Sequence, residues 1–254
     1  MPLVTTDLHD GVAVVTLNDP DHRNALNAEM VGDIQVAFEW LERDESNCSV
    51  VVVTGAAPAF CAGANLGNLA AATQSSLREI YEGFLRVGRS RLPTIAAVNG
   101  AAVGAGVNLA LCCDVILCGE SARIDTRFLK LGIHPGGGHT WLMRRLVGSQ
   151  VAKAAVLFGE VFDGKEAERV GFAYKCLPDA ELLPYAMAMA ARAASVEDEL
   201  TERIKESIDH AEVVADHEQA VANELVSQLW SMGLPGFRER LDAAQADIGL
   251  TPPR

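Results

Sequence analysis

Two segments rich in small residues could present backbone amide groups to a ligand. Residues 60–66 follow the β-branched run 50–54, and residues 99–109, which contain Gly104 and Gly106, follow Thr94–Val98. Glycines after a strand let a ligand approach the unpaired N–H groups at the start of the next helix. Two such amides facing one cavity would stabilise an oxyanion, as acyl-transfer or enolate chemistry requires. The alternative is that these small residues only allow close helix–strand packing, because a lone glycine pattern is weak evidence.

Other chemistries find less support in the sequence. The phosphate-binding pattern G-x-x-x-x-G-K-[ST] is missing, and Gly104-x-Gly106 lacks the third glycine of a dinucleotide site. The six cysteines form no C-x-x-C pair, which favours buried thiols in a reducing compartment. Cys61 is a possible nucleophile, but no base is paired with it in the sequence, so packing is the favoured interpretation. We expect no metal site.

Alternating strands and helices position the two segments. Runs of β-branched residues predict strands at Val12–Leu17, 50–54, Thr94–Val98 and 115–118. Between the first two, Asn27 is a predicted N-cap, followed by an apolar stripe that includes Met30, Ile34, Phe38 and Leu41. From residue 140 onward the spacing is mainly helical, with helices expected at 141–147, 150–158, 165–170 and along 197–229. The pattern predicts an α/β domain without a dividing linker.

Composition and charge narrow the partners. The chain has 254 residues, 49% of them hydrophobic, and a formal net charge of −13, which opposes binding to nucleic acid or to an anionic membrane surface. The first residues lack the basic and apolar stretches of a secretion signal, so we expect a cytoplasmic protein. Residues 94–113 are uncharged, but Asn99, Asn108 and three glycines interrupt them. We expect a strand, a glycine turn and a short helix there, and no membrane segment.

The two segments together resemble the enoyl-CoA hydratase/isomerase (crotonase) family. The resemblance rests on Phe60-Cys-Ala-Gly-Ala-Asn-Leu66 and on Ala96-Ala-Val-Asn-Gly-Ala-Ala-Val-Gly-Ala-Gly-Val-Asn-Leu-Ala110. Further matching positions are the loop 22–27, Cys113-Asp114, the turn 135–140 with Arg145-x-Val-Gly148, and Ala167-x-x-x-Gly171-Phe172. The resemblance covers roughly residues 8 to 245, and motifs this numerous and correctly ordered are specific to a fold.

The resemblance implies an architecture and a ligand. It implies an α/β spiral of β-β-α units over residues 1–195, and a helical C-terminal region over 196–254 that completes a homotrimer or a dimer of trimers. The ligand would be an acyl-CoA thioester in a bent pose. Coenzyme A would be part of the substrate, and no cofactor would be bound permanently.

The resemblance also assigns residues. The amides of Ala64 and Ala105 would form the oxyanion hole. Arg23, Ala25 and Leu26 are expected to contact the nucleotide end of CoA, and Ala62 and Leu66 to lie beside the pantetheine and adenine. Asn65, Gly104 and Gly136 are also expected to contact CoA or the acyl group. Arg240 would reach the CoA phosphates across a subunit interface.

The sequence departs from the family at its two catalytic carboxylates. The positions of the two hydratase glutamates are occupied by Asn108 and Phe128. An amide is not a general base, and a phenyl ring neither binds nor polarises water. Isomerases that keep only the second glutamate are excluded by Phe128 as well, and a further acidic position of some relatives falls on Gly136. We therefore do not expect two-glutamate hydration.

Other residues could replace the missing glutamates. Asp125, His134 and His139 lie near the same wall, and Glu79 or Glu82 could enter from residues 78–88. Asp125 is equally able to pair with Arg123 or Arg127, and a structural role is favoured for His134. His139 has a reference pKa suited to acid–base work, although a helix-capping or solvent-exposed position is the favoured interpretation.

Three functions stay open on the sequence. The first is an acyl-CoA lyase or isomerase with a non-standard acid/base, which could be His139, Asp125 or a water held by Asn108. The second is a protein that binds long-chain acyl-CoA without converting it, since an amide and a ring make the pocket less charged. The third is a purely structural oligomer.

Overall fold

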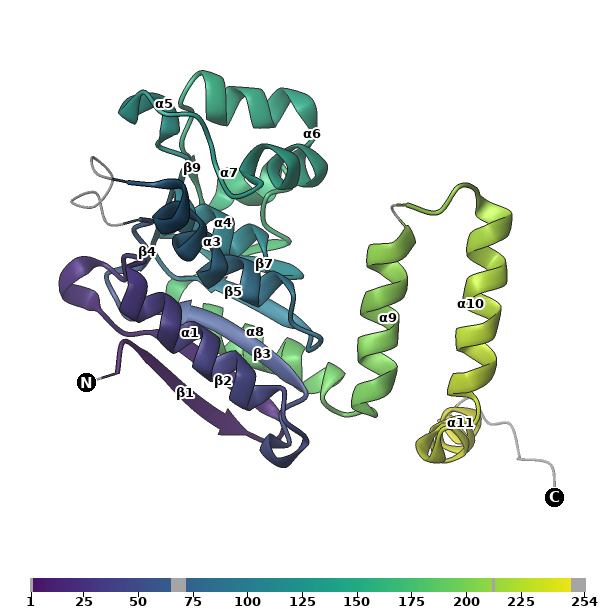
Figure 1. The fold of residues 1–254 in the computed structure, drawn as a ribbon. Helices are drawn as coiled ribbons and strands as arrows, with labels where there is room; N and C mark the ends of the chain where they lie inside the picture. Colours follow the sequence, from purple (N-terminus) through teal and green to yellow (C-terminus); the bar gives the residue numbers. More distant parts are fainter. Residues whose placement is uncertain (1, 65–71, 212, 248–254) are drawn as a thin grey trace. The chain divides into compact units, whose positions relative to one another are not determined.

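The computed structural model describes residues 2–64, 72–211 and 213–247. The chain divides into two compact units, Met1–Ala191 and Arg192–Arg254 (Figure 1). The first unit contains the strands and the predicted oxyanion segments, and the second is helical.

A mixed sheet forms the base of the first unit. Among the described residues it has six strands, in the order β1 (Val4–His9), β2 (Val12–Leu17), β3 (Val50–Gly55), β5 (Thr94–Val98), β7 (Val115–Gly119) and β10 (Lys175–Leu177). Only β1 and β2 pair antiparallel. Every residue of β3 and β5 is buried, because these strands lie between other strands and under helices on both faces.

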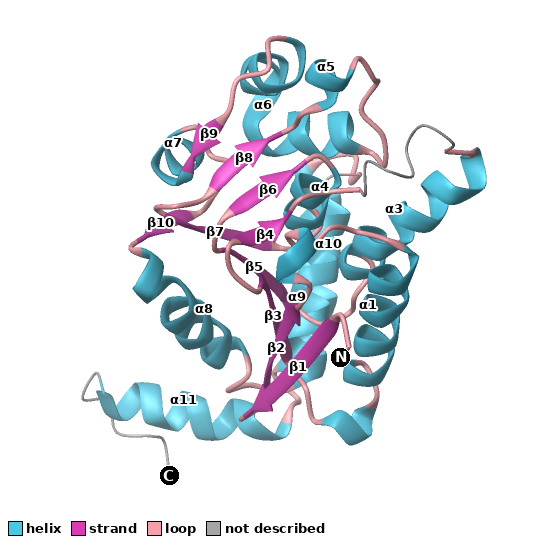
Figure 2. Ribbon diagram, turned by 90° about the vertical axis from the view of Figure 1, so that its left-hand side faces the viewer, coloured by secondary structure: helices cyan, strands magenta, loops and turns pink. Residues whose placement is uncertain are grey.

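A second sheet is made of very short strands. Its order is β4 (Ala59–Cys61), β6 (Ala101–Val103), β8 (Arg123–Asp125) and β9 (Phe162–Asp163), with β4, β6 and β8 parallel (Figure 2). Each of β4, β6 and β8 directly follows a strand of the first sheet, so the chain climbs from one sheet to the other and returns through helical segments. This repeated step is the expected spiral of β-β-α units.

The helices of the first unit cover the sheets. They are α1 (Ala28–Leu41), α3 (Gln74–Gly88), α4 (Ala105–Leu111), α5 (Phe128–Leu131), α6 (His139–Leu157), α7 (Gly164–Arg169) and α8 (Asp179–Ala193), with short 3-10 turns at Pro20–His22 and Asp44–Ser46. In α1 the side chain of Asn27 accepts from the Met30 N–H, and Ile34, Phe38 and Leu41 are buried. The predicted cap and apolar stripe are confirmed.

Two expected segments differ from the structure. The strand β6 lies between β5 and α4, where only a glycine turn was expected, because residues 101–103 pair with β4 on one side and β8 on the other. The two helices expected at 141–147 and 150–158 are joined in α6, with a break at Gly148, whose φ is +75°. Within the described part of the chain, no helix is long and apolar enough to cross a membrane.

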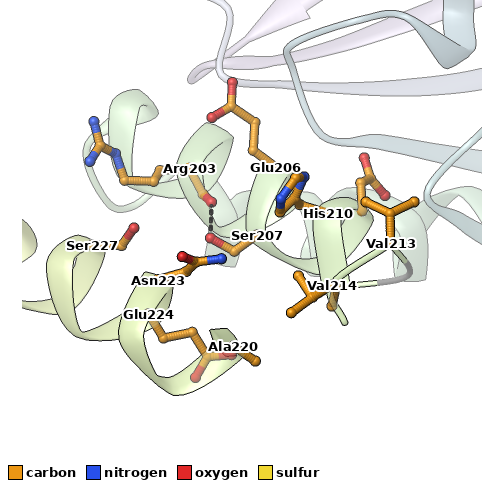
Figure 3. A pocket seen from close by; sticks show the side chains of 12 residues that line it. Arg203, Glu206, Ser207, His210, Val213, Val214, Ala220, Asn223, Glu224 and Ser227 are labelled. Atoms are coloured by element: carbon orange, nitrogen blue, oxygen red, sulfur yellow. Dashed lines mark hydrogen bonds between the residues drawn. The ribbon is translucent and has the colours of Figure 1, made fainter. Parts of the chain in front are cut away.

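The second unit contains α9 (Asp198–Ala211), α10 (His217–Ser231) and α11 (Pro235–Asp247). The guanidinium of Arg203 on α9 stacks 4.0 Å from the ring centroid of Trp230 on α10. Figure 3 shows a groove between these two helices, lined by side chains such as Glu206 and His210 of α9 and Asn223 and Glu224 of α10. None of the residues predicted to form the active site lines this groove.

Candidate active site

The two small-residue turns meet at the ends of β4 and β6. A Cβ on Gly106, at the start of α4, would overlap the carbonyl oxygen of Cys61 at the end of β4. A Cβ on Gly63 would overlap the carbonyl oxygen of Val103 and lie 3.3 Å from the nitrogen of Ala105. Only glycine permits this approach, so the glycines bring the two turns together.

The predicted oxyanion amides lie at this junction. Ala105 is the first residue of α4, preceded by Gly104 with a φ of +52°, and the first N–H groups of a helix have no partner inside it. Ala64 follows Gly63, whose carbonyl accepts from the Leu26 N–H at 2.8 Å. The hydrogen bonds of the described residues leave the N–H groups of Ala64 and Ala105 without an acceptor. That these two amides serve a ligand stays a prediction.

The predicted CoA loop is tied to the first turn. The N–H of Ala62 donates to the carbonyl of Arg23 at 3.0 Å, and Leu26 donates to Gly63 as above. Ala25 and Leu26 are buried, whereas the side chain of Arg23 is exposed, as a residue that meets phosphates in solution must be. The structure thus brings Arg23, Ala25, Leu26 and Ala62 together. Asn65 and Leu66 lie outside the described residues.

Asn24 organises this loop, and sequence reasoning gave it no role. Its side chain is fully buried, and its Nδ2 donates to the carbonyls of Ala56 and Ala59, both at 2.8 Å. Its Oδ1 accepts from the Asp19 N–H. The backbone at Asn24 has a φ of +57°, a region in which asparagine is more common than most residues. An Asn directly after Arg23 in a tight turn was the available signal.

Arg240 lies in the second unit. Its guanidinium pairs there with the carboxylate of Glu197, which also accepts from the Gly236 N–H at 2.9 Å. The expected contact of Arg240 with CoA phosphates stays a prediction.

Asn108 and His139 form a buried hydrogen-bonded pair. Asn108 lies on α4, three residues after Ala105, and its Nδ2 donates to the carbonyl of Gly136 at 3.1 Å. Its Oδ1 lies 2.6 Å from Nδ1 of His139. His139, the first residue of α6, is 1% exposed, so the favoured interpretation of this histidine as a cap or a solvent-exposed residue is wrong. The residue before it, Gly138, occupies the N-cap with a φ of +82°.

Phe128 packs against the same imidazole. Its ring and that of His139 meet edge to face, with centroids 4.9 Å apart. His139 therefore contacts the side chains at both positions where the resemblance places glutamates. Side chains of α3 pack against the turn that precedes His139. A Cβ on Gly136 would overlap the Tyr81 hydroxyl, and a Cβ on Gly137 would overlap the Phe84 ring.

The protonation of His139 follows from its partners. A carbonyl only accepts, so Nδ2 of Asn108 must face Gly136, and Oδ1 then faces His139. Nδ1 must carry a hydrogen to donate to that oxygen. Burial lowers the pKa of His139 to about 4, so the ring is neutral near pH 7 and Nε2 has a free lone pair. Nε2 is buried and has no hydrogen-bond partner among the described residues.

The other candidate acids and bases are engaged elsewhere. Asp125 is buried, which raises its pKa, but hydrogen bonds and charge from Arg127, aided by Lys130, outweigh burial and lower the pKa. Of the two partners that the sequence left open for Asp125, Arg123 and Arg127, the structure contains the pairing with Arg127, at 2.7 Å. His134 is exposed and contacts the Pro135 carbonyl.

The two carboxylates of α3, Glu79 and Glu82, do not contribute to the Asn108–His139 pair either. Glu82 pairs with Arg89 at 2.7 Å, and Glu79 is exposed. Neither carboxylate is hydrogen-bonded to Asn108 or His139 in the described part of the chain.

Two further residues resolve the remaining alternatives. Burial raises the pKa of Cys61 to about 12, which removes the thiolate a nucleophile needs and supports the packing interpretation. Trp141 on α6 contributes nothing to a core, because it is 57% exposed, with Arg145 stacked on its ring. The described residues contain no cluster of three or more histidine, cysteine or acidic side chains able to hold a metal ion.

Comparison with known proteins places the chain in a family. The model of the enoyl-CoA hydratase/isomerase family matches residues 7–245. A protein named as a probable enoyl-CoA hydratase of Mycobacterium tuberculosis is 45% identical over 251 residues, which cover 96% of each chain. The 2,3-dehydroadipyl-CoA hydratase of Escherichia coli is 37% identical over 208 residues, 80% of each chain.

Solved structures agree over the whole chain. An enoyl-CoA hydratase of Bacillus anthracis has a TM-score of 0.86 at 28% identity and covers 99% of this chain and 98% of its own. An enoyl-CoA hydratase subunit of Geobacillus kaustophilus has a TM-score of 0.87 at 29% identity, covering 99% and 97%. With the junction of the two amide-bearing turns, these matches show that the chain belongs to the enoyl-CoA hydratase/isomerase family.

Proposed function

We propose that this protein binds acyl-CoA thioesters and stabilises the enolate form of the thioester with the amides of Ala64 and Ala105. The observation that carries the proposal is the junction of the two turns, where both N–H groups are free of acceptors in the described residues. Donors fixed before the reaction stabilise developing negative charge on oxygen without reorganisation, which is their main catalytic value.

The proposed activity belongs to the lyase and isomerase reactions of enoyl-CoA substrates, but it does not use the two-glutamate mechanism. At the two glutamate positions, Asn108 already donates to Gly136 and bonds His139, and Phe128 packs on the same imidazole. That mechanism needs two carboxylates to hold and activate water, and neither Asn108 nor Phe128 supplies a carboxylate.

A second candidate is binding of long-chain acyl-CoA without conversion. It is favoured by Phe128, which adds apolar surface, and by the engagement of Asn108 with two protein partners. Both candidates require the same carbonyl clamp.

The carbonyl clamp is testable by ligand comparison. Butyryl-CoA and S-butyl-CoA, a thioether without the carbonyl oxygen, are titrated calorimetrically into the protein. Two hydrogen bonds of about 1 kcal/mol each predict a thioester preference of roughly tenfold or more. Equal affinities would show that the carbonyl is not held at the amides.

A proline at the first position of α4 removes one donor with little disturbance, because this position tolerates proline. Ala105→Pro is therefore expected to reduce the thioester preference about three- to tenfold while the thioether affinity is kept. Ala105→Gly keeps the N–H and is the matched control, with an unchanged preference.

We also propose a homotrimer, or a dimer of trimers, in the cytoplasm. The family resemblance supports the assembly, and the six reduced cysteines support a reducing compartment. The charge of −13 argues against nucleic acid as a partner.

A further inference from the structure

The imidazole of His139 lies against both side chains at the positions where the resemblance places the catalytic glutamates. It hydrogen-bonds Asn108 at one glutamate position and packs on Phe128 at the other. Asn108 is three residues from Ala105 on α4, and residues at this spacing share a helix face, roughly 4.5 Å apart along the axis. The ring is therefore tied to α4 within about one helical turn of one of the two proposed oxyanion donors.

The hydrogen bonds leave one ring nitrogen for chemistry. Asn108 fixes the hydrogen on Nδ1, as derived above from the Gly136 carbonyl. Nε2 then carries a lone pair, is buried, and has no partner among the residues described. A buried polar atom without a hydrogen-bond partner costs free energy of folding. Such atoms are often catalytic groups, and a catalytic role would explain why Nε2 has no partner here.

The surroundings keep this nitrogen neutral and about as basic as a carboxylate. The elements around the ring carry Tyr81 on α3, Asp125 on β8, Arg127 and Lys130 at α5, and Arg144 and Arg145 on α6. Asp125 is neutralised by Arg127 and Lys130, and burial alone accounts for the lowered pKa of His139. That pKa, about 4, is close to the ordinary value of a glutamate, about 4.3.

Resting on the proposed function, we propose that Nε2 of His139 is the single acid–base atom of this site, and that it moves a proton between C2 and C4 of a 3-enoyl-CoA thioester. The C2–H bond breaks and the proton forms a bond to Nε2, while the electron pair passes into the dienolate whose oxygen the amides of Ala64 and Ala105 hold. The N–H bond then breaks, C4 takes the proton, and the double bond shifts from C3=C4 to C2=C3. Asn108 is a positioning residue that holds the tautomer.

A proton shift fits this site better than addition of water. One base suffices to carry a proton between two carbons on the same face of a substrate. Hydration also needs polar groups that hold a water molecule, and Phe128 offers only a phenyl ring beside His139. The apolar wall instead excludes water from the dienolate.

The experiment follows trans-3-hexenoyl-CoA in D2O by mass spectrometry and NMR, with the full-length protein. The wild type is expected to form trans-2-hexenoyl-CoA with less than one deuterium atom per molecule at C4, because the base carries the substrate's own proton. His139→Gln, which replaces the base by an uncharged polar side chain, is expected to lose this isomerisation by about 100-fold or more. Binding of butyryl-CoA and its preference over S-butyl-CoA are expected to stay within a few-fold. His134→Gln, in the same turn but exposed, is the matched control with full activity.

A second variant tests the positioning role and does not depend on the stability of His139→Gln. In Asn108→Asp a carboxylate accepts the hydrogen bond from Nδ1. The negative charge favours the charged imidazole and so raises the pKa of His139. The acidic limb of the pH–rate profile for isomerisation is therefore expected to move up by about one pH unit or more.

Four outcomes would overturn the inference. Wild-type binding with the carbonyl preference but without exchange or isomerisation would remove the acid–base role and leave the proposed thioester binding intact. Full activity of His139→Gln, or an unmoved limb in Asn108→Asp, would assign the proton transfer elsewhere. Accumulation of a product heavier by one water, in place of the shifted alkene, would replace the proton shift by hydration.

Discussion

A neutral histidine enclosed in a protein couples folding to pH. In the folded chain burial lowers the pKa of His139 to about 4, whereas in the unfolded chain the ring returns to its ordinary value of 6.5. Between these values the unfolded state binds a proton that the folded state does not, so the free energy of unfolding falls as pH falls. Above 6.5 both states are neutral and His139 adds no pH dependence.

This coupling gives a prediction for stability. From pH 7 to about pH 5, His139 is expected to remove about 2 kcal/mol from the free energy of unfolding, and about 3 kcal/mol by pH 4. Urea unfolding at the two higher pH values measures the loss in the wild type, in His139→Gln and in His134→Gln. Only His139→Gln should lose this part of the dependence; if it keeps the wild-type slope, the ring is not held neutral in the folded protein.

At the scale of elements, the turn before α6 directs His139 inward. Gly137 and Gly138 have φ values of +66° and +82°, so both need a backbone that favours glycine. They differ in their surroundings. A Cβ on Gly137 would overlap the Phe84 ring and lie 3.1 Å from Nδ2 of Asn108, whereas a Cβ on Gly138 meets nothing within 4 Å.

The pair of glycines allows a matched substitution. Gly138→Ala is expected to cost about 1 kcal/mol from backbone strain alone. Gly137→Ala adds overpacking against Phe84, for a total of about 2–4 kcal/mol, and displaces Asn108, so the isomerisation rate should also fall. Thermal or urea unfolding compares the two variants. Equal losses in both would mean that α3 and α4 yield easily at this turn and do not fix the Asn108–His139 pair.

The sequence predicted the elements better than it predicted how their side chains meet. The strands at Val12–Leu17 and Thr94–Val98 and the cap at Asn27 follow from local patterns, and the structure contains them. The strand β6 was missed because its three residues are stabilised only by pairing with distant strands.

Side-chain environments depend on the same distant contacts. Asn24 was missed because the carbonyls to which its Nδ2 donates lie more than 30 residues away in sequence. The burial of His139 was missed because it depends on the path of a three-glycine turn, and Trp141, two residues later on α6, points to solvent instead.

At the scale of the molecule, the net charge bears on ligand binding, whereas the exposed apolar surface bears on assembly. The net charge of −13 opposes a polyanionic ligand such as CoA, so we expect its phosphates to depend on local groups such as Arg23. In the second unit, α10 carries an apolar stripe at Val221, Leu225 and Leu229, with exposed fractions of 50%, 53% and 61%. A helical stripe of this kind is expected to be buried against another surface.

The proposed trimer supplies that surface, and the prediction is a change in mass. The wild-type chain of 27.0 kDa should sediment as a trimer or a multiple of it. Leu225→Glu places a charge in the stripe, and burying an unpaired charge costs several kcal/mol, so this variant is expected to dissociate toward the monomer. Val36→Glu is the matched control, because Val36 on α1 is 66% exposed and the same change there should leave the mass unaltered. Analytical ultracentrifugation decides between them: a wild-type monomer, or a Leu225→Glu trimer as stable as the wild type, would show that the stripe on α10 is not the assembly surface.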